Sequence, residues 1–304
     1  MRRRVKLIFN PHAHRGRAWG QASTLQAILA RYGDAEWAAT EHPGQGTPLA
    51  QEAARQGFDI VAALGGDGTA NEVINGLMRV PADRRPLMAV VPVGSGNDFA
   101  SNVGVKMDAD QAMQRVFAGD PRTIDLGEVT DQAGRTRYFG NVLGIGFDAI
   151  VTLYSYRSKR LQGFAMYLWC VIQTILRNHD APLLTIANDE ETYTQNALMY
   201  TICNGPREGG GFFVAPDAKL DDGLLHYACI KRVSRLMMFR LIPEVMNGTH
   251  GRFKEVRLGH FKDMTLKSDR PLVIQIDGEI LAGFQSDVTG LHVRVLPGAL
   301  QMIV

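Results

Sequence analysis

The stretch FDIVAALGGDGT at residues 58–69 decides the fold, because it joins an apolar run to a glycine-rich turn and a helix. The apolar run at residues 60–64 predicts a buried strand, and residues 69–78 have the spacing of a helix. The glycines of the turn lack Cβ atoms, so backbone N–H groups can approach an anion where the helix N-terminus adds positive charge. The turn is therefore a candidate phosphate site; the alternative is a tight turn that binds no ligand.

Asp67 within this turn favours the phosphate site over the plain turn. A carboxylate beside bound phosphates repels them unless Mg²⁺ lies between or the carboxylate faces a proton-donating nucleophile, and both arrangements belong to phosphoryl transfer. The sequence has no G-x-x-x-x-G-K-[ST] motif, which excludes a P-loop NTPase. Thr69 with Glu72 three residues later has the pattern of a capping box and predicts the start of the helix.

A second glycine-containing loop, PVGSGNDFA at residues 92–100, follows the next apolar run, at residues 87–91. Loops at the carboxyl ends of neighbouring parallel strands form the crevice in which open α/β sheets bind ligands. Ser95 and Asn97 are therefore candidate nucleotide contacts, and Asp98 is a candidate helix cap.

Residues 1–124 alternate short apolar runs with helical patterns, which predicts a three-layer α/β domain around a mostly parallel sheet. The expected strands are residues 5–9, 36–40, 60–64 and 87–91. The expected helices are residues 18–32, 49–56, 69–78 and 108–118.

Residues 125–304 change to longer β-rich stretches and predict a second, largely antiparallel domain of the β-sandwich type, whose last segment is free to pack back on the first domain. The expected strands are residues 138–145, 183–186, 197–203, 224–230, 257–266 and 272–276. Two helices are expected in this domain, at residues 158–176 and 235–246.

The composition excludes several classes of protein. The chain has 304 residues, 33 basic and 31 acidic, and the net charge of +2 excludes a dedicated nucleic-acid binder. Three widely spaced cysteines exclude a disulfide framework and a cysteine zinc site, and they favour a reducing, cytoplasmic compartment. The N-terminus lacks the apolar core of a signal peptide, and the longest apolar run is shorter than the roughly 20 residues that span a membrane.

GGDGTANEVINGL at residues 65–77, followed by PVGSGNDFA, resembles the diacylglycerol kinase catalytic-domain family of lipid kinases. That family includes sphingosine, ceramide and bacterial diacylglycerol or phosphatidylglycerol kinases. Further segments resemble the family's other motifs: Asn10-Pro11 with Gly16, DLG at 125–127, NVLGIGFD at 141–148, LDDGL at 220–224 and DGE at 277–279. The chain departs from the family at His14-Arg15-Gly16, where a serine usually precedes the glycine, and at Gly44-Gln45-Gly46.

The resemblance implies an ATP-dependent lipid kinase that requires Mg²⁺ and serves phospholipid biosynthesis, with an NAD kinase-like first domain. By motif position, the implied nucleotide-binding residues are Asn10, Thr40, Gly65, Gly66, Asp67, Gly68, Thr69, Asn71, Glu72, Gly94, Ser95 and Asn97. The resemblance also implies a structural Mg²⁺, held by the Asp222 carboxylate and the backbone carbonyls of Lys219 and Leu224. Glu279 is the first choice for the base that takes the lipid hydroxyl's proton, with Asp277 and Asp67 as rivals.

Taken without the resemblance, the two acidic motifs have a plainer interpretation. Asp221-Asp222-Gly223 and Asp277-Gly278 are typical turn sequences, and a hairpin or loop without any ligand accounts for both.

The segment at residues 163–176 is apolar nearly all round and is flanked by Arg157, Lys159, Arg160 and Arg177. Such a helix is either buried in the domain or in contact with something other than water. With the resemblance to lipid kinases, we interpret it as a gate for the lipid substrate and as a contact with a membrane surface, where the basic residues hold anionic headgroups.

Three rival interpretations remain open. GIGFDA at residues 144–149 matches a dinucleotide-binding pattern, but no acidic residue follows about 20 positions later. An NAD kinase shares GGDGT and the two-domain plan. The third rival is a catalytically silent nucleotide-binding regulator at the membrane surface. The sequence also leaves open whether the chain forms a homodimer.

Overall fold

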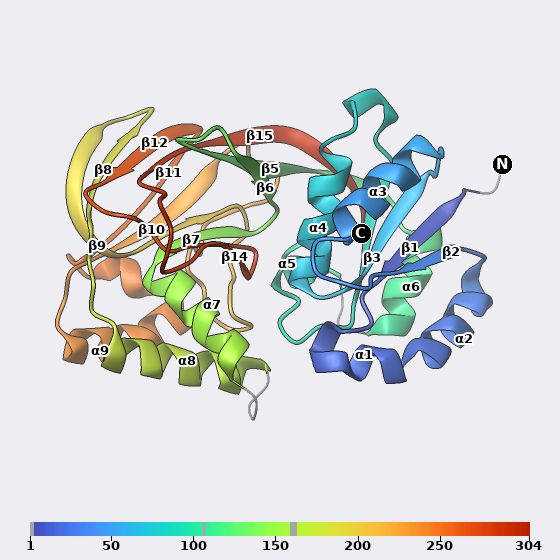
Figure 1. Ribbon diagram of the computed structural model, residues 1–304, viewed down its shortest axis with the longest axis horizontal. Helices are drawn as coiled ribbons and strands as arrows, with labels where there is room; N and C mark the ends of the chain where they lie inside the picture. Colours follow the sequence, from blue (N-terminus) through green and yellow to red (C-terminus); the bar gives the residue numbers. More distant parts are fainter. Residues whose placement is uncertain (1–2, 106–107, 159–162) are drawn as a thin grey trace. The chain divides into compact units, whose positions relative to one another are not determined.

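The chain folds as two units in a computed structural model that describes residues 3–105, 108–158 and 163–304 (Figure 1). The first unit is Met1–Ile124 together with Gly298–Val304, and the second is Asp125–Pro297.

A parallel sheet forms the centre of the first unit. Its strands are β1 (Val5–Phe9), β2 (Glu36–Ala39), β3 (Ile60–Gly65), β4 (Leu87–Pro92) and the last residues of β15 (Gly290–Ile303). The order is β2-β1-β3-β4-β15, and every pair in it is parallel. All residues of β3 are buried, as expected for a parallel strand that is covered on both faces.

Helices cover this sheet in two layers. They are α1 (Arg17–Gly20), α2 (Ala22–Tyr32), α3 (Gly46–Arg55), α4 (Asp67–Leu77), α5 (Asp98–Asn102) and α6 (Ala109–Ala118). The helices α3 and α4 pack together, as do α2 and α6, and Figure 1 shows the two pairs on opposite sides of the sheet. Gly76 lets α3 approach closely, since a Cβ there would lie 2.3 Å from the carbonyl oxygen of Thr47. The three-layer α/β prediction for this unit is confirmed.

Two antiparallel sheets form the second unit, and the long strand β9 (Thr192–Cys203) belongs to both. The first half of β9 pairs with β8 (Leu183–Asn188), and the second half pairs with β7 (Val142–Gly146) and β10 (Leu225–Lys231). The remaining strands are β5 (Pro121–Asp131), β6 (Thr136–Phe139), β11 (Val256–Phe261), β12 (Asp263–Ser268), β13 (Ile274–Ile276), β14 (Glu279–Ala282) and β15. The prediction of a β-sandwich is confirmed.

Two expected strands are each divided in the structure. The expected strand at residues 257–266 is divided into β11 and β12, which lie in different sheets. The chain turns between them because the Asp189 carboxylate accepts the backbone N–H groups of Lys262 and Asp263. The expected strand at residues 138–145 is divided between β6 and β7 by Gly140 and Asn141, whose backbone N–H groups are bonded to Asp277.

Helices α7 (Phe147–Arg157), α8 (Gly163–Arg177) and α9 (Arg235–Met246) lie together on one side of these sheets (Figure 1). The second unit therefore has two apolar cores. One lies between the sheets, where the rings of Tyr200 and Tyr227 stack at 5.4 Å, and the other lies under the three helices. The sequence pattern missed α7. No helix within the described residues is long and apolar enough to cross a membrane.

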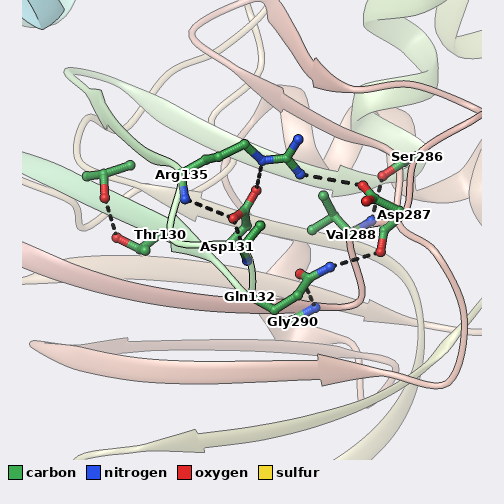
Figure 2. A network of polar contacts seen from close by, with 10 residues as sticks. Thr130, Asp131, Gln132, Arg135, Ser286, Asp287, Val288 and Gly290 are labelled. Atoms are coloured by element: carbon green, nitrogen blue, oxygen red, sulfur yellow. Dashed lines mark hydrogen bonds and ion pairs between the residues drawn. The ribbon is translucent and has the colours of Figure 1, made fainter.

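A polar network fixes the turn between β5 and β6 to the segment that precedes β15 (Figure 2). The Asp131 carboxylate accepts the backbone N–H groups of Ala133 and Arg135 at 2.9 and 3.0 Å, and the Arg135 side chain binds both Asp131 and Asp287. Burial opposes ionisation of Asp131, but these hydrogen bonds outweigh it and lower the pKa of the carboxyl.

Candidate active-site residues

The two glycine loops of the first unit touch each other through their backbones. They follow the neighbouring strands β3 and β4, and the N–H of Val93 donates to the carbonyl of Gly65 at 2.9 Å. A Cβ on Gly94 would lie 2.4 Å from the Cα of Gly66, so no other residue fits at Gly94 without a shift of the backbone. The loops therefore form one surface at the carboxyl ends of the strands, where α/β sheets bind ligands.

Asp67 fastens the second loop to the first. It is the half-buried first residue of α4, and its carboxylate accepts the backbone N–H groups of Asn97 at 2.7 Å and Phe99 at 2.9 Å. Burial raises the pKa of Asp67, and these backbone hydrogen bonds oppose that rise. Gly96 lies close by, since a Cβ there would be 2.9 Å from the Asp67 Oδ2. Asp67 thus holds the two loops together, and this structural role does not depend on a bound ligand.

Asn97 folds the second loop on itself. Its Oδ1 accepts the N–H of Gly94 and its Nδ2 donates to the carbonyl of the same residue, both at 3.0 Å. Asn97 also occupies the N-cap position of α5 with a φ of +60°, so the expectation that Asp98 caps this helix is wrong. Asp98 is instead the first residue inside the helix, because the left-handed conformation of Asn97 ends the loop one residue earlier.

The expected capping box of Thr69 and Glu72 is also wrong. The helix α4 begins at Asp67 with Gly66 as its N-cap, so Thr69 lies inside the first turn. The Oγ of Thr69 instead accepts a hydrogen bond from the Asn10 side chain at 3.0 Å.

Glu72 binds the loop that follows β2 instead of its own helix end. Its carboxylate accepts the backbone N–H groups of Gly44 and Gly46, both at 2.7 Å. Together with the bond from Asn10 to Thr69, this joins α4 to the loops that follow β1 and β2. Ser95 is exposed, and Thr40 and Asn71 are buried. Of the candidate nucleotide-binding residues outside α4 and its N-terminal turn, Asn10, Gly94 and Asn97 contact them directly. Within the described residues, no hydrogen bond joins Thr40 or Ser95 to α4.

The candidate metal loop of the second unit is held by Asp125. The Asp125 Oδ2 accepts the N–H of Gly223 at 2.7 Å, and its own N–H donates to the carbonyl of Leu220. The Asp222 Oδ1 accepts the N–H of Leu224 at 3.0 Å, and the His226 Nε2 lies 3.4 Å from the Asp222 Oδ2. Among the described residues, no three His, Cys, Asp or Glu side chains are grouped to hold a metal. A metal here would depend on one carboxylate with backbone carbonyls and water.

Asp277 and Glu279 lie in one turn but differ in their surroundings. The buried Asp277 accepts three backbone N–H groups at 2.8 to 2.9 Å, from Gly140, Asn141 and Val142, and so holds the start of β7. Glu279 is exposed.

The hydroxyl of Tyr156 orients Glu279. Its single proton is shared between the Glu279 carboxylate, at 3.1 Å, and the carbonyl of Gly278, at 2.7 Å. Partial burial and the charge of Glu279 raise the pKa of this phenol, so it remains a hydrogen-bond donor. The geometry leaves Glu279 the more accessible of the two carboxylates.

Sequence reasoning missed a buried polar cluster of Asp148, Glu208 and Gln275 in the second unit. The Gln275 Nε2 donates to Asp148 at 2.9 Å and to Glu208 at 2.8 Å, and its Oε1 accepts the N–H of Gly278 at 2.8 Å. Burial raises the pKa of Asp148. The sequence feature that could have indicated this cluster is the isolated Glu208 in the run PREGGG, at residues 206–211.

The glycines of GIGFDA serve this packing. A Cβ on Gly144 would lie 1.7 Å from the Asp148 Oδ2, and Gly146 has a φ of +76° where β7 passes into α7. The dinucleotide interpretation is therefore not needed to explain them.

An apolar pocket lies in the second unit beside this cluster, under the helices α7, α8 and α9. Its volume is about 70 Å³. On α8, the side chains that line it are Tyr167, Val171 and Ile175, which form one stripe at helical spacing. The opposite side of α8 leaves Trp169 and Leu176 exposed, at 47% and 58%. The helix thus separates a pocket from solvent with apolar residues on both sides.

Two family profiles match the chain. Residues 4–129 match the family profile described as the diacylglycerol kinase catalytic domain. Residues 141–304 match the profile described as the YegS C-terminal NAD kinase beta sandwich-like domain.

Individual relatives cover most of the chain. Proteins named "Probable lipid kinase YegS-like" from Yersinia pestis (strain Pestoides F) and Yersinia pseudotuberculosis serotype O:1b (strain IP 31758) are each 28% identical over 263 residues, which are 86% of this chain and 83% of the relative. A crystal structure of a candidate diacylglycerol kinase from Bacillus anthracis str. Sterne has the same fold, with a TM-score of 0.79 and 24% identity over 99% of this chain and 96% of that one.

Proposed function

This chain belongs to the diacylglycerol kinase catalytic-domain family, and on that basis we propose that it transfers the γ-phosphate of ATP to the hydroxyl group of a lipid. The single observation that carries the proposal is the contact between the two glycine loops, which Asp67 holds together at the N-terminus of α4. Glycine backbone N–H groups and the positive end of a helix together bind phosphate groups.

In the proposed complex, the phosphates of ATP lie against residues 65–68 and the exposed Ser95. Asn10, Thr69 and Glu72 keep the surrounding loops in place through the hydrogen bonds that join them to α4. Because phosphoryl transfer depends mainly on positioning and charge neutralisation, this ordering is itself a contribution to the rate.

The residues at the candidate metal loop fit Mg²⁺ in their chemistry. Mg²⁺ takes oxygen ligands and keeps several waters, and Asp222 with the carbonyls of Lys219 and Leu224 offers only oxygen. The loop is ordered by Asp125 independently of any ion. An Mg²⁺ ion bound at this loop would be structural, and the Mg²⁺ that neutralises phosphate charge would lie beside Asp67.

We assign Glu279 as the group that accepts the proton of the lipid hydroxyl. As that proton leaves, the hydroxyl oxygen of the lipid attacks the γ-phosphorus and ADP is released. Glu279 is exposed, and the Tyr156 hydroxyl orients it. Three backbone N–H groups already occupy the carboxylate of Asp277, which we assign to the structure of the turn.

The acceptor lipid is proposed to reach the protein from a membrane surface, through the region of α8. Exposed Trp169, Leu176 and Leu236 supply apolar contacts, and Arg177 and Arg240 supply nearby positive charge for anionic headgroups. Lys159 and Arg160, expected to add to this charge, lie outside the described residues. The proposed location is thus the cytoplasmic face of a membrane, with α8 as the lipid gate.

Transfer of labelled phosphate from [γ-³²P]ATP tests the proposal. The acceptors are diacylglycerol, phosphatidylglycerol, sphingosine, ceramide and NAD, and the organic and aqueous phases are counted separately. Label in one lipid supports the proposed function and names its acceptor. Label in NAD alone favours the NAD kinase alternative, and binding of ATP without any transfer favours the silent regulator.

A further inference from the structure

We propose that the apolar pocket of the second unit selects ligands whose head group is an uncharged or cationic hydrogen-bond donor, through the buried carboxyl groups of Asp148 and Glu208, and rejects anionic head groups. This deepens the proposed lipid kinase activity, on which its link to the acceptor rests.

The lining of the pocket is apolar except at one place. Asp148, Glu208 and Tyr167 are its polar members, and no lysine, arginine or histidine lines it among the described residues. The other side chains that line it are apolar and come from α7, α8, α9, the strands β9 and β10, and the loop between these two strands.

The two carboxyl groups belong to one cluster. Asp148 and Glu208 are only 4% and 6% exposed, and both accept a hydrogen bond from the same nitrogen, the Nε2 of Gln275. The Tyr167 hydroxyl donates to the other oxygen of Asp148 at 3.1 Å. These contacts fix both carboxyls at the wall of the pocket.

Charge decides which head group this cluster accepts. Two carboxylates in apolar surroundings cannot both be ionised at low cost, and burial raises the pKa of Asp148 accordingly. An ammonium ion relieves that repulsion, and a hydroxyl donates to a carboxylate oxygen without adding negative charge. A carboxylate or phosphate on the ligand adds a further negative charge where the lining provides no cation, so it is rejected.

The polar end of the pocket is connected to the residue that we assign as the base. The Gln275 Oε1 accepts the N–H of Gly278, and Glu279 is the next residue along the chain. A head-group donor bound by Asp148 and Glu208 therefore contacts the same cluster that fixes the Glu279 turn. This donor is a different group from the hydroxyl that receives the phosphate, because the cluster rejects phosphate. Applied to lipids, this favours an acceptor whose head group carries a further neutral hydroxyl or an amine over one that carries a phosphodiester.

The size of the pocket sets the probes. One water-sized group needs about 10–15 Å³ of such a cavity, so a pocket of about 70 Å³ takes roughly five to seven heavy atoms before its walls move. Hexylamine and hexan-1-ol have seven heavy atoms and hexanoate has eight. The three share one six-carbon chain and differ in the charge of the head group.

The test measures direct binding of each probe to the full chain by isothermal titration calorimetry at pH 7.5, without nucleotide. We expect hexylamine and hexan-1-ol to bind at least about tenfold more tightly than hexanoate, a difference of about 1.4 kcal/mol. Equal or tighter binding of hexanoate to the wild-type chain overturns the proposal, and this comparison needs no variant.

A double variant, Asp148→Asn with Glu208→Gln, removes both charges and keeps the side-chain shapes. Its preference should fall to less than about twofold, whereas Asp287→Asn, a matched change at an exposed acid, should keep the wild-type preference. Circular dichroism checks that each variant is folded. If the folded double variant still discriminates tenfold, the two carboxyls are not the selecting groups.

The binding assay and the kinase assay can fail independently. Discrimination among the probes without phosphate transfer to any lipid leaves this inference intact and removes the proposed function. Transfer of phosphate without discrimination among the probes does the reverse.

Discussion

Replacement of Asp67 by asparagine should destabilise the glycine loops and abolish phosphate transfer. The carboxylate uses one oxygen for the N–H of Phe99, at 2.9 Å, and the other for the N–H of Asn97, at 2.7 Å. The amide of asparagine has a single acceptor oxygen, so one of these backbone N–H groups would face an NH₂ group instead.

The magnitude follows from that lost bond. A hydrogen bond to a charged group contributes about 1.5–3 kcal/mol, and a buried N–H left without an acceptor costs about 1–3 kcal/mol. We therefore expect Asp67→Asn to lower the free energy of unfolding of the first unit by about 1.5–3 kcal/mol. The first unit should remain folded, because β3 and its neighbours do not depend on this contact.

Urea unfolding followed by tryptophan fluorescence measures this change in one unit. Of the chain's three tryptophans, Trp19 and Trp37 lie in the first unit and Trp169 in the second. A Trp169→Phe background therefore reports on the first unit alone, and Asp83→Asn, at an exposed acid, is the matched control.

Two results would refute this reasoning. A change below about 0.5 kcal/mol in the unfolding free energy would show that Asp67 does not hold the second loop. A folded Asp67→Asn variant with a near wild-type rate of phosphate transfer would show that the carboxylate has no role with phosphates or Mg²⁺.

Three further predictions follow from the second unit. Glu279→Gln should lower the rate of phosphate transfer with little change in thermal stability. Asp277→Asn should lower the free energy of unfolding by about 1–3 kcal/mol, because it disturbs three backbone hydrogen bonds. A stable Asp277→Asn variant that has lost transfer, beside an active but destabilised Glu279→Gln variant, would exchange the roles of the two residues. Asp222→Ala should raise the Mg²⁺ concentration needed for half-maximal transfer, and an identical Mg²⁺ dependence in wild type and variant would contradict the metal assignment. The folded-state pKa of Asp131 lies below its unfolded value of about 3.9, so its contribution to the free energy of unfolding is present above that pH and is lost as the pH falls through the folded pKa. In urea unfolding from pH 6 to pH 2, the wild-type chain should therefore be more stable than Asp131→Asn, and this difference in unfolding free energy should shrink below about pH 4. A difference that stays constant with pH would contradict this role of Asp131.

Local patterns predicted the first unit well. The apolar run before Gly65 is β3, the run at residues 87–91 lies within β4, and their loops meet because neighbouring parallel strands end at one edge of the sheet. Each of these features depends on residues close together in the sequence.

Contacts between distant residues could not be predicted in the same way. Glu72 has the spacing of a capping residue, yet it binds Gly44 and Gly46, and that choice depends on where another loop lies in the fold. The division of the expected strand at residues 257–266 depends likewise on Asp189, a residue far away in the sequence.

The buried carboxyl cluster shows the same limit at the candidate site. Asp148, Glu208 and Gln275 lie on separate segments, and their spacing along the chain matches no motif. Their meaning comes from shared burial beside an apolar pocket, which exists only once α7, α8 and α9 have packed on the sheet.

The most direct test of the account is the phase in which ³²P is found after incubation of the full chain with [γ-³²P]ATP, Mg²⁺ and mixed lipid vesicles, beside a folded Asp67→Asn control. We predict label in the organic phase for the wild-type chain and none above background for the variant. Label that stays in the aqueous phase for the wild-type chain with every lipid of the panel would contradict the proposed lipid kinase activity.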